Sequence, residues 1–217
     1  VRPTRSLAMY QRLVFIFCIF TSGCISMPDT KNIIQNMYNI PTSGVSKFDG
    51  TQHVRMSNMF CSSTIILEMY QDTNKALNDL VLVKAGVSSI NNIGGARSLL
   101  FKVDGDIKYF TPTSELTEHS NIYLGSGVNK SYSFKTYLIP EVYIRKMANA
   151  NELMAKMYLL NNTYVEGDCS ITDFDTYSKN NPNSAIKITQ EHINMSNLSV
   201  AQTGIKNFMT LIDNRVW

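Results

Sequence analysis

Apolar and polar residues alternate along much of the chain beyond residue 51, and this period of two predicts β-strands with one buried face. Asp104-Gly105 and Asn161-Asn162 interrupt the alternation and are typical of tight turns, since Asp, Asn and Gly tolerate a positive φ. Residues 112–120 are expected to form a polar loop. The expected strands cover residues 53–61, 64–70, 80–87, 98–103, 107–110, 131–139, 152–160 and 163–166.

Other segments have helical spacing instead. Pro140 suits the first turn of a helix and Glu141 is favourable near its positive end, so we expect a helix that runs to about Asn149. Residues 182–196 predict a second helix, in which His192 lies on the apolar side. A single histidine in that position is expected to be a hydrogen-bonded core residue.

The last helix has the clearest pattern. Ser199-Val200-Ala201-Gln202 is typical of a capping box at a helix start. The apolar stripe that follows has helical spacing and consists of Ala201, Ile205, Phe208, Met209 and Ile212. We therefore expect the α+β class, with a mostly antiparallel β-sheet or sandwich and two to three packed helices, two of them C-terminal.

The beginning of the chain follows a different pattern. Arg12 precedes an unbroken apolar run over residues 13–20, and small residues follow the run. This order is typical of a secretory signal, and roughly eight apolar residues are far fewer than the ~20 that span a bilayer. A buried core helix is the alternative, although arginines and no acidic residues precede the run. The chain begins at Val1, and Met9 is an alternative start.

Thr21-Ser22-Gly23-Cys24 ends this segment and resembles the lipobox of bacterial lipoproteins, although Thr21 stands where Leu is usual. The resemblance implies that Cys24 is lipidated and becomes the N-terminus. Several acyl chains would anchor it stably in a membrane, since each buried CH₂ contributes about 0.8 kcal/mol. Ile25 in place of Asp implies the outer membrane if the host is Gram-negative. The alternative is ordinary cleavage near Gly23 and a free soluble protein.

These observations divide the chain into a signal peptide (1–23), a lipid-anchored tether (24–50) and a single α+β domain (51–217). The net charge of +3 comes from arginines of the first segment; without them 17 basic and 17 acidic side chains remain. A neutral domain has no long-range field to attract nucleic acid, so a nucleic-acid partner is excluded.

Four cysteines are present, of which Cys18 lies in the expected signal segment and Cys24 is the lipidation site that the lipobox resemblance implies. The remaining two, Cys61 and Cys169, are expected to form a disulfide in an oxidising compartment. Two separate buried thiols are the alternative. The sequence lacks the C-x-x-C and H-x-x-x-H spacings of zinc sites, and we expect no metal or cofactor.

Candidate chemistry is sparse in the domain. His119 and Glu118 share the expected polar loop and are weak candidates for an acid/base or metal site; a solvated loop is the alternative. The sequence identifies no other catalytic, cofactor-binding or metal-binding residues.

The expected function is therefore a lipid-anchored protein of the bacterial envelope with a non-enzymatic interaction or assembly domain, and its partner could be another envelope protein. A periplasmic hydrolase with an unrecognised site is one alternative. A ligand- or glycan-binding module is another, suggested by 11 Tyr and 10 Phe.

Overall fold

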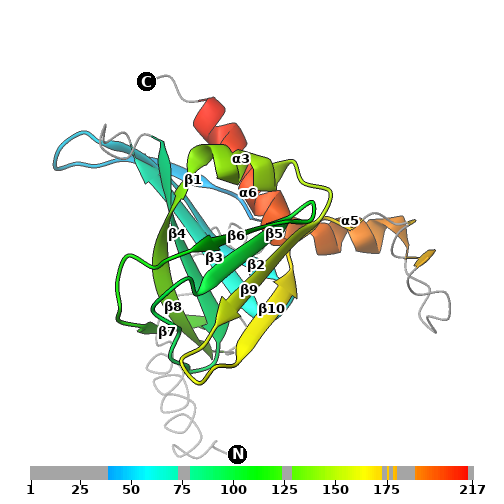
Figure 1. Ribbon diagram of the computed structural model, residues 1–217. Coiled ribbons are helices and arrows are strands. Elements are labelled where there is room, and N and C mark those ends of the chain that lie inside the picture. Colours follow the sequence, from blue (N-terminus) through cyan, green and yellow to red (C-terminus); the bar gives the residue numbers. More distant parts are fainter. Residues whose placement is uncertain are drawn as a thin grey trace, which may run out of the picture. The chain divides into compact units, whose positions relative to one another are not determined.

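Figure 1 shows a computed structural model of the chain, which describes residues 39–72, 79–123, 129–172 and 189–214, with 175, 178 and 179 between the last two ranges. The expected signal peptide and Cys24 lie outside these residues. The described strands form two sheets, and every strand pair is antiparallel. The six-stranded sheet has the order β1-β2-β3-β4-β8-β7 and contains β1 (Thr42–Val45), β2 (Gln52–Cys61), β3 (Ile65–Asp72), β4 (Leu80–Ser88), β8 (Asn129–Pro140) and β7 (Glu118–Tyr123). The four-stranded sheet has the order β10-β9-β5-β6 and contains β10 (Tyr164–Asp168), β9 (Leu153–Tyr158), β5 (Leu99–Val103) and β6 (Asp106–Phe110).

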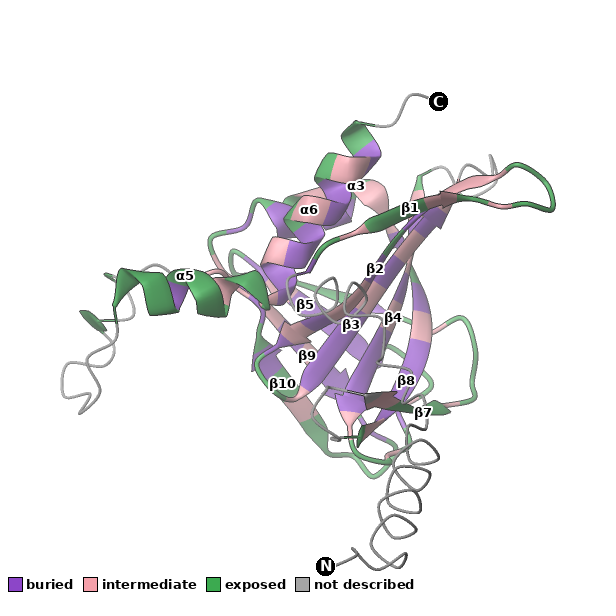
Figure 2. Cartoon of the chain, turned by 180° about the vertical axis from the view of Figure 1, so that it is seen from behind, coloured by how far each residue is buried: buried purple, intermediate pink, exposed green. Residues whose placement is uncertain are grey.

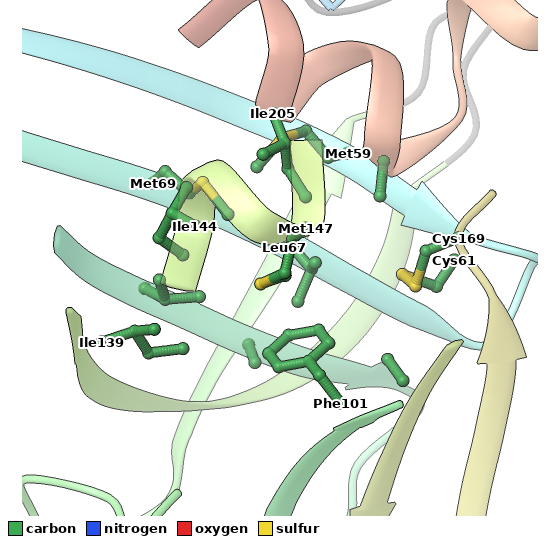
Figure 3. Packing of buried hydrophobic residues seen from close by; sticks show 14 of the residues in the cluster. Met59, Cys61, Leu67, Met69, Phe101, Ile139, Ile144, Met147, Cys169 and Ile205 are labelled. Carbon is green, nitrogen blue, oxygen red and sulfur yellow. A yellow bond between two sulfur atoms is a disulfide. The ribbon is translucent and has the colours of Figure 1, made fainter. Parts of the chain in front are cut away.

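Both sheets contribute to one hydrophobic core. On β5 the alternate residues Leu99, Phe101 and Val103 are all fully buried, as the period of two predicts. The same core includes Leu67 and Val83 from the six-stranded sheet. Figure 3 shows Phe101 facing Leu67 in the space that the two sheets and the helices enclose.

Three described helices complete the fold, α3 (Glu141–Ala148), α5 (Gln190–Leu198) and α6 (Ala201–Asp213), and the α+β prediction is confirmed. Helices α3 and α6 pack side by side (Figure 1). The predicted stripe on α6 is buried, with Ile205 directed at Met59 of β2 (Figure 3). Arg145 of α3 joins the two helices, because its guanidinium lies 2.7 Å from an oxygen of Asp213 in α6; the same group lies 2.6 Å from an oxygen of Glu141 within α3.

The predicted core position of His192 and the predicted capping box over Ser199–Gln202 are both wrong. His192 is exposed and is the third residue of α5, where its ring and Thr189 at the N-cap form a capping box. Figure 2 shows how little of α5 is buried. Helix α6 begins after Val200 without a side-chain cap. Gln202 is buried instead; its amide donates to the Ala150 carbonyl at 2.6 Å and accepts from the Ile171 N–H at 2.7 Å.

Two edge strands were not expected. Residues 42–45 of the expected tether form β1, which pairs with β2. Glu118 begins β7, so the expected polar loop over 112–120 ends earlier than predicted. Both strands carry mostly exposed side chains, and edge pairing depends on backbone hydrogen bonds that any side chain permits.

The disulfide lies where the two sheets meet. Cys61 ends β2 and Cys169 follows β10; both are fully buried, and their sulfurs are bonded at 2.06 Å (Figure 3). The predicted pairing is thereby confirmed. Neighbouring backbone bonds reinforce this junction: the Ser62 N–H donates to the Asp168 carbonyl at 2.8 Å.

Gly167 permits this close approach, because a Cβ there would overlap the carbonyl oxygen of Cys61. Gly167→Ala is therefore expected to lower the free energy of unfolding by about 1–3 kcal/mol, as overpacking does in other cores. Urea denaturation measures the effect. The matched control is Gly95→Ala, where a Cβ meets open space and a change within ~0.5 kcal/mol is expected. Equal effects of the two substitutions would contradict the packing argument.

Candidate functional site

Strand β8 carries a lysine on its inward face. Its residues Ser133, Lys135, Tyr137 and Ile139 pair with Val87, Ala85, Val83 and Val81 of β4, and all eight are buried. Only 2% of Lys135 is exposed, and it is the one charged residue among the buried ones that the structure describes. A cation in this position is unusual because burial penalises an unpaired charge.

The ammonium group of Lys135 has little compensation from the protein. Its Nζ donates to the backbone carbonyl of Glu115 at 2.6 Å. No ion pair within 4.0 Å is found for it among the described residues. Burial lowers the pKa of Lys135, and the negative charge of Glu115 opposes this shift. Burial of the charged ammonium group of Lys135 therefore costs free energy that its single hydrogen bond only partly offsets.

Lys135 lines a pocket of about 550 Å³, within the size range of small-molecule sites. The loop after β6 contributes residues Thr111 to Glu115 to the lining, which also includes Ile93 and Leu160. A neighbouring cavity of about 290 Å³ shares Leu160. The arrangement combines one buried cation, polar rim groups and apolar walls, which suits recognition of a small anionic molecule.

Glu118 and His119, the two weak candidates from the sequence, do not line this pocket. They lie on opposite faces of β7, because consecutive residues of a strand point to alternate sides. Glu118 forms an ion pair with Lys84 at 2.7 Å. His119 lies opposite Ser133, and its Nδ1 is 2.9 Å from the Ser133 hydroxyl. That hydroxyl donates its single proton to the Ser89 carbonyl, so Nδ1 of His119 is the donor in this contact.

Lys135 was not among the candidates, although the sequence contains a signal for it. In the strand predicted over residues 131–139, Lys135, Tyr137 and Ile139 are alternate residues and point to the same face. The pattern therefore puts a charged residue on the apolar face of the strand. The pocket itself depends on tertiary structure, since Thr111 and Leu160 are far from Lys135 in sequence.

Lys135→Met is expected to raise the free energy of unfolding by about 1 kcal/mol, because methionine fills similar space without a buried charge. Thermal or urea unfolding checks this expectation. Lys130→Met is the matched control on the same strand; its Nζ lies 5.5 Å from the Tyr132 ring, and its removal is expected to change stability by less than ~0.5 kcal/mol. A clear loss of stability in Lys135→Met would show that the lysine is needed for packing.

The residues that the structure describes contain no group of three or more His, Cys, Asp or Glu suited to a metal ion. None of the described helices has the length and hydropathy required to cross a bilayer.

No protein-family model matches the chain, and no curated protein matches it. One similar solved structure is the crystal structure of invasion associated protein B from Bartonella henselae, with a TM-score of 0.33 and 8% identity over 58% of this chain and 77% of that one. A likeness at this level supports no inference about fold or function.

Proposed function

We propose that the protein is exported, anchored in the bacterial envelope by a lipid on Cys24, and acts through binding or assembly by its β-rich domain. The outer membrane is the proposed site in a Gram-negative host. The disulfide Cys61–Cys169 carries the proposal, since disulfides persist in oxidising compartments such as the periplasm. The apolar run over residues 13–20 and the lipobox-like Thr21–Cys24 agree with the same location.

The outer face of the four-stranded sheet supports a role in binding. Register places Glu166, Lys156, Leu100 and Tyr109 in one row across all four strands. The same sheet face carries three tyrosines with exposed rings, Tyr109, Tyr158 and Tyr164, which we call the tyrosine face. They are 49%, 37% and 53% exposed respectively, and tyrosines of this kind are enriched in protein interfaces.

The positions of polar groups in the pocket also favour binding over hydrolysis. A serine nucleophile needs a base within hydrogen-bond reach. Ser114 lines the pocket, but its Oγ accepts from the Leu116 N–H at 3.2 Å, and Lys135 donates to the Glu115 carbonyl. A ligand-binding module is therefore the second candidate function.

Cys24→Ser tests the anchor. In cells that express the full chain, the wild-type protein is expected in the detergent phase of membrane extracts, and Cys24→Ser in the aqueous phase. Cys18→Ser is the matched control, because it removes a thiol of the same segment without touching the lipidation site. Equal membrane association of Cys24→Ser and wild type would overturn the anchor.

The tyrosine face can be tested separately in living cells. A photoreactive residue in place of Tyr109 is expected to crosslink to an envelope protein in a saturable manner. The same residue in place of Phe48, which is 99% exposed on the β1–β2 loop, is the control for random encounters. Adducts that are the same at both positions would contradict a role of this face in binding.

A further inference from the structure

We propose that the pocket around Lys135 binds a small monocarboxylate, whose hydrocarbon part lies against the apolar walls. This inference deepens the proposed role in binding, and it depends on the folded domain alone.

The first argument is the unused hydrogen-bonding capacity of Lys135. An ammonium group has three donors, and the described contacts account for one of them, the bond to the Glu115 carbonyl. Only 2% of Lys135 is exposed, and the residue belongs to the pocket lining, so the pocket is where a further partner for the remaining donors can lie. A ligand oxygen would compensate this buried cation where the protein supplies no carboxylate within 4.0 Å among the described residues.

The second argument is the chemistry of the walls. Ile93, Pro112 and Leu160 line the pocket, which suits a hydrocarbon group more than a second charged group. The space of about 550 Å³ accommodates a small molecule, and a second cavity of about 290 Å³ has Leu160 in its lining as well. A ligand with one polar end and one apolar end fits this distribution.

The charge of the site selects a monoanion. Lys135 supplies one positive charge, and Glu115 on the same pocket lining carries a negative charge that acts on it. The Glu115 carboxylate repels any anion in the pocket, and it repels a doubly charged one such as HPO₄²⁻ about twice as strongly as a monoanion. A carboxylate carries a single charge and offers two oxygens to the donors of one ammonium group.

Titration of the purified full-length protein with hexanoate tests the proposal, followed by NMR of ¹³C-labelled lysine side chains. The comparison probes are 1-hexanol, which has the chain without the charge, and inorganic phosphate, which has charge without the chain. Hexanoate is expected to shift the Lys135 signal in a saturable manner and to leave that of Lys130 in place. Both comparison probes should bind at least about tenfold more weakly.

The variants give the second readout. Lys135→Met is expected to weaken hexanoate binding at least about tenfold, and Lys130→Met to leave it unchanged. Unchanged binding in Lys135→Met, no saturable shift in the wild type at about 10 mM hexanoate, or phosphate binding as tight as hexanoate would each overturn the proposal. If Lys135→Met does not fold, the wild-type shifts decide. A negative titration would not contradict the proposed lipid anchor, because the titration uses purified protein and does not test membrane association.

Discussion

Replacing both Cys61 and Cys169 by alanine is expected to lower the free energy of unfolding by about 2–5 kcal/mol. The two residues are 108 positions apart, so the disulfide restricts a large part of the unfolded chain. For a loop of this length, chain entropy sets a contribution of about 4.7 kcal/mol. Urea denaturation of the oxidised wild type and of the double variant measures the difference.

Reduction provides the control for this experiment. A reductant is expected to destabilise the wild type by a similar amount and to leave the double variant unchanged. If the native protein contains two titratable thiols at these positions after unfolding without reductant, the disulfide is absent and the stability argument fails.

Raising the pH from about 10 to 12 is expected to destabilise the fold by roughly 4 kcal/mol, because Tyr137 and Tyr143 stay largely protonated in the native state while the unfolded chain loses these protons. The pKa of each phenol is raised from 10.0 to about 12, mainly because the side chain is buried. The unfolded chain loses these protons near pH 10 and binds fewer than the native state above it. The stabilisation from each buried tyrosine is therefore fully present well below pH 10 and is lost as the pH rises through 12, with a limiting loss of about 2.7 kcal/mol per tyrosine above that pH.

Tyr137→Phe tests the assignment. Tyr137 is fully buried, and its hydroxyl lies 2.9 Å from that of Ser98. Removal of this hydroxyl in Tyr137→Phe should remove about half of the alkaline destabilisation. The lowered pKa of Lys135 acts in the opposite direction, since the unfolded state binds more protons there. Tyr109→Phe, at an exposed position, is the control. A pH profile that Tyr137→Phe leaves unaltered would contradict the role of burial.

Local signals in the sequence were sufficient where neighbouring residues determine the backbone. The Asp104-Gly105 turn has φ values of 49° and 86°, as a tight hairpin requires, and it connects β5 to β6 as predicted. The apolar stripe of α6 is buried because helical spacing places all its members on one side. The two buried cysteines were paired from composition and compartment alone.

Tertiary structure decided the rest. The spacing of His192 predicts a position on the apolar side of a helix, but α5 begins at Gln190, which makes this residue part of the helix cap. Strand β7 was missed because residues 118–121 are polar and the edge of β8 provides their pairing. The pocket was missed for a related reason: Lys135, the loop from Thr111 and the turn at Leu160 meet only when the two sheets are assembled.

Intact mass spectrometry of the native protein, extracted from membranes of the cells that make it, tests the proposed export and anchoring most directly. We predict a chain that begins at Cys24, carries acyl groups there, and lacks two hydrogens at Cys61 and Cys169. A molecule that retains residues 13–20, with an unmodified Cys24 and two free thiols, would contradict the proposal.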